Sequence, residues 1–138
     1  MKQVLRNKDT GTKLERYKKS FFHAIDGIVY ATFNEHNMLI IIPCMILAII
    51  AGIVFKITSV EWLFMTLVIG LVIGSELINT AIEAVVDLET LDENELAKIA
   101  KDTASSATLV FSIVAFTGAL IMFVPKLIIM LEVLWKKN

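Results

Sequence analysis

The sequence predicts an all-α integral membrane protein. Hydrophobic residues make up 57% of its 138 positions, and the mean hydropathy is +0.73. Three apolar stretches each approach the ~20 residues that a membrane-spanning helix needs. They give expected spans at about 37–56, 61–87 and 97–125. The same composition argues against a soluble domain of this size.

An amphipathic helix is expected ahead of the first span, at about 13–34. A mostly apolar set of residues recurs there at helical spacing: Leu14, Tyr17, Phe21, Ile25, Ile28 and Thr32. Polar side chains, among them Arg16, His23 and Asp26, occupy the other side. The pattern is typical of a helix in the membrane interface, and equally of a helix packed on the protein's own core. Both interpretations stay open.

The distribution of basic residues predicts the orientation in the membrane. Seven of the 13 Lys and Arg residues precede Met38: Lys2, Arg6, Lys8, Lys13, Arg16, Lys18 and Lys19. By the positive-inside rule they place the N-terminus in the cytoplasm. Alternation of the spans then puts the loop at 87–101 on the cytoplasmic side and the C-terminus outside.

A polar run at 76–87 lies at the end of the second apolar stretch. At about 100° per residue, one helix face collects four polar side chains: Glu76, Asn79, Glu83 and Asp87. An acidic side chain costs roughly 2.5 to 3.5 kcal/mol at the centre of a span and usually serves a function there. The alternative is that Asn79 and a protonated Glu76 only form hydrogen bonds between helices.

A second polar segment opens the third span. Five of its side chains share one side of the expected helix: Asn94, Lys98, Lys101, Asp102 and Ser105. This side can face the 76–87 run at the cytoplasmic boundary. Because Mg²⁺ takes oxygen ligands and lysine neutralises phosphate, the two segments together suit a site for phosphate and magnesium. A solvated helix start with intrahelical charge pairs is the alternative.

A third polar cluster, at 34–37, lies where the amphipathic helix meets the first span. It contains Glu35, which taken alone is more simply explained as a solvated carboxylate. Three polar clusters at one membrane face are harder to explain by solvation. Their coincidence favours a site.

The sequence lacks the common active-site and nucleotide-binding motifs of soluble enzymes. It contains no G-x-x-x-x-G-K-[ST] loop, no H-E-x-x-H and no nucleophile elbow. Cys44 is the only cysteine, which excludes an internal disulfide. The basic residues lack interleaved aromatics on a soluble face, so no nucleic-acid partner is expected.

The sequence resembles the prokaryotic diacylglycerol kinase family of small integral membrane lipid kinases. The resemblance extends over about 14–127 and rests on three segments: ELINTAIEAVVD at 76–87, LAKIAKD at 96–102, and KSFFHA at 19–24 with Gly27 and Ile28. These variants look most like the Gram-positive branch, whose members are undecaprenol kinases. Three positions depart from the family's pattern: His36, Ser106 and Thr108.

The resemblance implies a homotrimer of three-span protomers in the bacterial inner membrane, with active sites shared between neighbours at the cytoplasmic face. Glu76 would then be the general base, with Asn79 beside it. Glu35 and Glu83 would hold Mg²⁺ on the ATP phosphates. The implied ATP contacts are Arg16, His23, Glu35, Glu83, Asp92, Glu93, Asn94, Lys101 and Asp102. The implied lipid contacts are Arg16, Glu76 and Ser105.

The leading functional hypothesis is ATP-dependent phosphorylation of a membrane lipid by a single domain over 1–138, whose tail at 126–138 has no assigned role. Undecaprenol is the expected acceptor. Diacylglycerol is the alternative, because the sequence of an apolar pocket says little about which of two lipids it prefers. Intramembrane Glu and Asn also suit a small proton-coupled transporter subunit, but that hypothesis leaves Lys101 and the acidic loop unexplained. A structural subunit, with polar residues that only fix helix pairing, is a third hypothesis.

Overall fold

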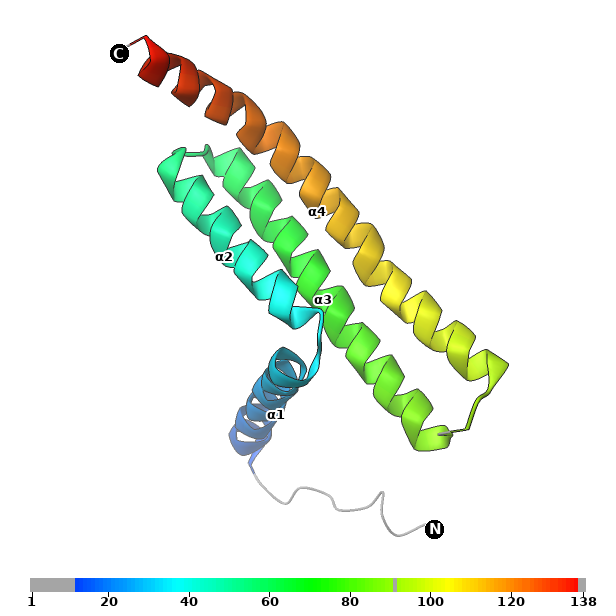
Figure 1. The fold of residues 1–138 in the computed structure, drawn as a ribbon. Coiled ribbons are helices and arrows are strands. Elements are labelled where there is room, and N and C mark those ends of the chain that lie inside the picture. Colours follow the sequence, from blue (N-terminus) through cyan, green and yellow to red (C-terminus); the bar gives the residue numbers. More distant parts are fainter. Residues whose placement is uncertain (1–11, 91, 137–138) are drawn as a thin grey trace.

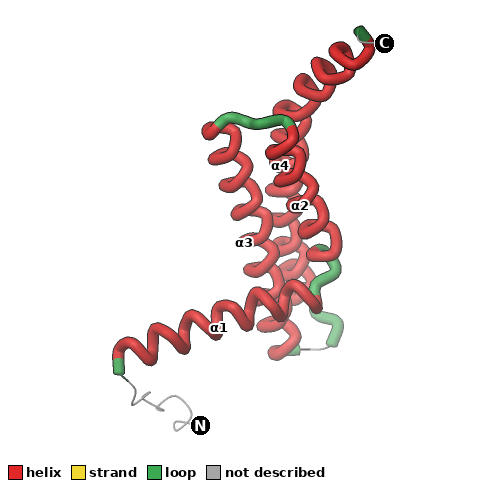
Figure 2. Tube along the Cα trace, turned by 90° about the vertical axis from the view of Figure 1, so that its left-hand side faces the viewer, coloured by secondary structure: helices red, strands yellow, loops and turns green. Residues whose placement is uncertain are grey.

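The computed structural model describes residues 12–90 and 92–136 (Figure 1). Its helices are α1 (Lys13–Asn34), α2 (Met38–Val54), α3 (Ser59–Glu89) and α4 (Glu95–Trp135). α3 lies between α2 and α4 in Figure 1, while α1 turns away from α2 by 104° (Figure 2). Some of the residues in the predictions lie outside the described ranges: Lys2, Arg6 and Lys8, and Lys137 and Asn138 of the tail.

Two of the described helices, α3 with 31 residues and α4 with 41, are long and apolar enough to cross a membrane. α2 has 17 residues, which at 1.5 Å per residue is about 26 Å, slightly less than the ~30 Å hydrocarbon core. Taken together as one bent span, α1 and α2 would also be long and apolar enough to cross a membrane. The three stretches predicted as spans are thus helical, and α2 is the shortest.

Capping side chains determine where the helices begin. Thr58 begins α3 with a capping box, in which its hydroxyl accepts from the N–H of Glu61 and the Glu61 carboxylate accepts from the Thr58 N–H. Thr12 begins α1 in the same way. The side chain of Asn94 accepts from two N–H groups in the first turn of α4. Each such cap contributes about 1 kcal/mol.

Two ion pairs between α3 and α4 fix their antiparallel register. Lys101 Nζ lies 2.5 Å from Asp87 Oδ1 at one end of the pair, and Lys126 Nζ lies 2.9 Å from Glu61 Oε1 at the other. A step of 26 residues along α3 therefore matches a step of 25 along α4. This register determines which α4 residues lie opposite the polar face of α3.

The core is centred on α3. Its buried side chains recur at helical spacing: Met65, Val68, Val72, Ser75, Glu76, Asn79 and Thr80. α1 is buried only near its C-terminal end, where Ala31 is 1% exposed, while its apolar Tyr17 and Phe21 are 75% and 65% exposed. Apolar surface of this extent requires lipid or further protein to cover it.

α4 continues beyond the predicted end of the third span at about 125. The helix passes through Pro125 and ends at Trp135. Proline lacks a backbone N–H, so Pro125 removes one hydrogen bond from the helix, yet the helix does not end there. Most of the tail that was predicted at 126–138 is therefore a continuation of α4.

Gly118 of α4 lies against the ring of Phe64 of α3. A Cβ at Gly118 would lie 2.7 Å from Phe64 Cε1, so Gly118→Ala is expected to lower stability by about 1 kcal/mol through overpacking. Gly70→Ala is the matched control, because a Cβ there would meet no described atom within 4 Å. Thermal unfolding in detergent measures both variants. Equal midpoints would contradict the close approach of α3 and α4 at this point.

Candidate active site

α3 carries a polar face that becomes more exposed toward its C-terminal end. Glu76 is 0% exposed and Asn79 is 2% exposed, whereas Glu83 is half-buried and Asp87 is exposed. Asn79 Nδ2 donates a hydrogen bond of 2.8 Å to Glu83 Oε1. The face therefore connects a buried carboxylate to the end of the helix over about three turns.

The buried end of this face has unsatisfied polar atoms. Within the described part of the chain, four atoms are buried without a hydrogen-bond partner: both carboxylate oxygens of Glu76, Asn79 Oδ1 and Thr108 Oγ1. Leaving such a group unpaired costs roughly 1–3 kcal/mol. The register set by the two ion pairs places Thr108 near the level of Asn79. These groups thus form one layer of the bundle, where a polar group of a ligand would find partners.

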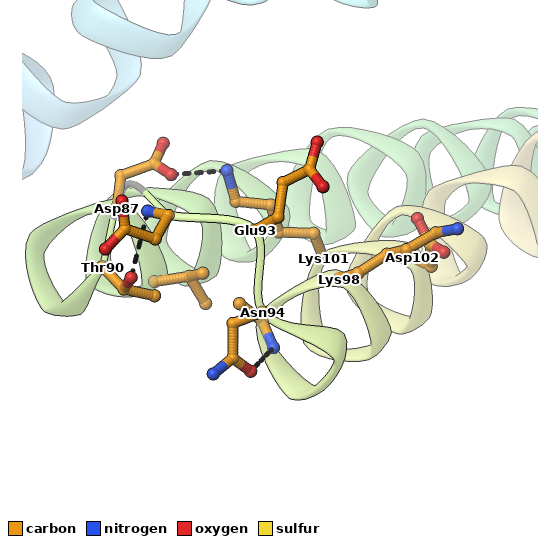
Figure 3. Close-up of a pocket in the computed structure, with 10 residues that line it drawn as sticks. Asp87, Thr90, Glu93, Asn94, Lys98, Lys101 and Asp102 are labelled. Carbon is orange, nitrogen blue, oxygen red and sulfur yellow. Dashed lines mark hydrogen bonds and ion pairs between the residues drawn. The ribbon is translucent and has the colours of Figure 1, made fainter.

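A cleft of about 300 Å³ opens where α3 ends and α4 begins (Figure 3). Its polar lining consists of Asp87, Thr90, Asp92, Glu93, Asn94, Lys98, Lys101 and Asp102. In Figure 3 the ion pair of Lys101 with Asp87 spans the two helices. Thr90 Oγ1 accepts from the backbone N–H of Asp92 at 3.1 Å, which orders the beginning of the loop.

The cleft contains charges of both signs. Lys98 and Lys101 face four carboxylates: Asp87, Asp92, Glu93 and Asp102. A polyphosphate alone would be repelled by the carboxylates, whereas a divalent cation would bind both, because hard cations prefer carboxylate and phosphate oxygens. The positive end of the α4 dipole also favours an anion at this place. The cleft is chemically suited to a nucleotide with a divalent cation.

The structure brings together five of the residues predicted for ATP: Asp92, Glu93, Asn94, Lys101 and Asp102. Seven other predicted site residues lie outside this lining: Arg16, His23, Glu35, Glu76, Asn79, Glu83 and Ser105. His23 Nδ1 lies 3.7 Å from Asp26 Oδ2 on the exposed side of α1. Glu35 ends α1, where its N–H donates to the Ala31 carbonyl.

The predicted magnesium ligands belong to no metal-binding cluster within one chain. Among residues 12–90 and 92–136, no three His, Cys, Asp or Glu side chains are placed to hold a metal ion together. Glu83 already accepts from Asn79 through one oxygen, and Glu35 lies at the junction of α1 and α2.

An apolar groove of about 320 Å³ lies between α1 and α3, and the sequence analysis missed it. It is lined mainly by small side chains: Ala24, Gly27, Ile28, Tyr30, Ala31, Leu77, Thr80, Ala81 and Ala84. Thr80 Oγ1 donates to the backbone carbonyl of Glu76 at 3.0 Å, so the groove lies about one turn from Glu76. The sequence did contain a signal for this groove, because small residues recur at helical spacing in both α1 and α3. Thr90 in the cleft was also missed.

These features define a small helical membrane protein with a polar site at one end of its longest helix pair. A family model for prokaryotic diacylglycerol kinase matches residues 22–123. The chain is 38% identical over 121 residues to an undecaprenol kinase of Bacillus subtilis (strain 168), covering 88% of this chain and 98% of the relative. It is also 33% identical over 96 residues to a diacylglycerol kinase of Helicobacter pylori (strain J99), covering 70% of this chain and 75% of the relative.

A diacylglycerol kinase of Synechocystis is 35% identical over 113 residues, which cover 80% of this chain and 65% of the relative. The chain belongs to the prokaryotic diacylglycerol kinase family. It is therefore a lipid kinase, with ATP as co-substrate. The hypotheses of a proton-coupled transporter subunit and of a purely structural subunit lose their support.

Proposed function

We propose that the protein transfers the γ-phosphoryl group of ATP to the hydroxyl group of undecaprenol, with diacylglycerol as the alternative acceptor. The observation that carries this proposal is the fully buried Glu76 carboxylate at the inner end of a polar face that leads to the Lys101 cleft. The name of the Bacillus relative supports undecaprenol as acceptor.

In the proposed reaction the lipid hydroxyl oxygen attacks the γ-phosphorus. The new oxygen–phosphorus bond forms as the bond to the β,γ-bridging oxygen breaks, and ADP leaves with the electron pair. Glu76 takes the hydroxyl proton as general base, while Asn79 orients the hydroxyl. Phosphoryl transfer depends mostly on positioning and charge neutralisation, and a general base contributes about 10²- to 10⁴-fold.

The nucleotide is proposed to bind in the cleft, with Lys101 against the phosphates. Asp92, Glu93, Asn94 and Asp102 would contact the rest of ATP and its bound cation. The oxygen donors of Glu83 and Glu35 suit Mg²⁺, which would supply charge neutralisation at the phosphates. Asn79 holds one oxygen of Glu83 in place through their hydrogen bond.

The active site is proposed to be completed by neighbouring copies in a homotrimer. Arg16, His23 and Glu35 lie away from the cleft of their own chain, which is expected if they serve the cleft of another. The large uncovered apolar surface of the helices leaves room for such contacts. In this trimer α2 is proposed to be the third span of each protomer. The basic N-terminal segment favours a cytoplasmic N-terminus, so the site is proposed to face the cytoplasm, in the bacterial inner membrane.

The lipid is proposed to approach along the groove between α1 and α3. The groove is apolar and lies about one turn from Glu76, so an isoprenoid or acyl chain held there would keep its hydroxyl near the carboxylate. Ser105 would lie near the lipid on the α4 side. In this arrangement α1 lies in the membrane interface with Arg16 toward the headgroups.

The decisive experiment is a phosphorylation assay with purified protein in detergent, Mg-ATP and one of the two lipids. Undecaprenol is expected to be phosphorylated with a kcat/KM at least about tenfold above that for diacylglycerol. Transfer of labelled phosphate into extracted lipid measures it. A higher kcat/KM for diacylglycerol would overturn the acceptor assignment, and phosphorylation of neither lipid would overturn the proposed function.

A further inference from the structure

The C-terminal turns of α4 extend beyond the other helices. Residues 127–136, called the distal segment below, follow Lys126, which is held by Glu61 at the beginning of α3. In Figure 1 and Figure 2 these turns stand clear of α2 and α3. The family model matches as far as residue 123, and none of the proposed site residues lies in the distal segment.

The two ion pairs between α3 and α4 indicate where the membrane ends. From Lys101 to Lys126, α4 rises by about 38 Å, more than the ~30 Å hydrocarbon core and close to the ~40–45 Å that includes the headgroups. Charged pairs at these two levels are suited to the two membrane faces. A straight continuation of α4 beyond Lys126 would therefore carry the distal segment into water.

The composition of the distal segment is unsuited to water. All eight of its apolar side chains are at least 39% exposed, from Met130 at 39% to Trp135 at 85%. Its two polar side chains, Glu132 and Lys136, are one turn apart and share a helix face. Leu134 lies opposite that face. Ile129 lies beside Lys136, so the polar side is narrow and the rest of the segment is apolar. Trp near the end of such an apolar segment is typical of a membrane interface.

Pro125 is a position at which α4 could bend toward the membrane surface. It is located one residue before Lys126, and proline inside a helix removes a backbone hydrogen bond and permits a kink. The lipid-exposed side of α4 leads directly into the distal segment, since Leu120, Ile121 and Val124 are also uncovered. Ten residues are too few for a coiled coil with a second copy, which requires about three heptads.

We propose that the distal segment is a membrane-surface anchor. The segment lies at the boundary between headgroups and acyl chains. This boundary belongs to the leaflet on the membrane face opposite the cleft. The helix bends at Pro125, lays Leu127, Met130, Leu131 and Leu134 onto the acyl chains, and keeps Glu132 and Lys136 toward water.

Trp fluorescence tests this placement in intact protein. The chain has two Trp residues, so Trp62→Phe leaves Trp135 as the only reporter. In phosphatidylcholine vesicles brominated at acyl positions 6 and 7, its emission is expected to be partly lost relative to unbrominated vesicles, because an interfacial Trp lies near these carbons. Bromine at positions 11 and 12 should quench less. The double variant Trp62→Phe/Trp135→Phe, which has no Trp, provides the background signal.

Two other outcomes would each overturn the anchor. If iodide quenches Trp135 and the brominated lipids do not, the distal segment stands in water. If neither quencher acts, the segment is covered by protein, as in a contact with a second copy.

A spin-label comparison gives an answer that does not depend on Trp62. In a Cys44→Ser background, a nitroxide is attached at Leu131→Cys on the apolar side or at Glu132→Cys on the polar side. Oxygen collisions relative to those with a water-soluble nickel chelate should be higher at 131 than at 132. Equal ratios at the two positions would contradict the anchor.

Discussion

Glu76→Gln is expected to reduce lipid phosphorylation by about 10²- to 10⁴-fold, because glutamine cannot accept the hydroxyl proton. The reduction should appear in kcat, with little change in the KM for ATP. The free energy of unfolding should not fall. Glutamine has nearly the same shape as glutamate and cannot ionise, so no unpaired charge can be buried at this position. Steady-state assays with both lipids, together with thermal unfolding in the same detergent, measure the two effects.

Glu89→Gln is the matched control for this variant. Glu89 is the last residue of α3 and is exposed, outside the lining of the cleft, so its substitution should leave turnover unchanged. If Glu76→Gln retains full activity, Glu76 is not the base. If it disrupts assembly and turnover falls only as a result, the polar face acts in helix pairing instead.

Lys101→Met is expected to raise the KM for ATP by about 10- to 100-fold, because the phosphates lose a charge-assisted contact. The substitution also leaves the Asp87 carboxylate in the cleft without its ion-pair partner. Asp87→Asn breaks the same ion pair but keeps the lysine charge. It should therefore have a smaller effect on the KM for ATP, which is measured with saturating lipid.

The comparison between these two variants separates a role in binding from a role in folding. If the ion pair only joins α3 to α4, the two substitutions will change stability equally and leave KM unchanged. Lys126→Met is a control at the other end of the helix pair, where it breaks the contact with Glu61. It should affect stability but not the KM for ATP.

The helices and the polar face of α3 could be predicted because both depend on local periodicity. Glu76, Asn79 and Glu83 share a face in any α-helix, and the structure shows the hydrogen bond between the last two. Contact between this region and α4 was also predictable, since short loops join neighbouring helices. The particular pairing of Asp87 with Lys101 was not, because it depends on the register of two helices.

Other parts of the site could not be predicted from local pattern. The groove between α1 and α3 depends on the angle at which α1 leaves α2, which no short-range signal sets. The continuation of α4 through Pro125 was missed because a proline usually marks a helix boundary, whereas here long apolar flanks continue the helix. The structure places Glu35 outside the lining of the cleft, and its proposed role in the cleft of another copy depends on an assembly that no local pattern in the sequence indicates.

The matched spacing of the two ion pairs also constrains how the chain can change in length. A one-residue insertion in α4 between Lys101 and Lys126 would rotate one of these lysines by about 100° relative to the other, so one ion pair would be lost. A compensating insertion between Glu61 and Asp87 in α3 would restore it. Gaps in these two stretches should therefore occur together among homologous chains, whereas the length of the helix after Lys126 is free to vary.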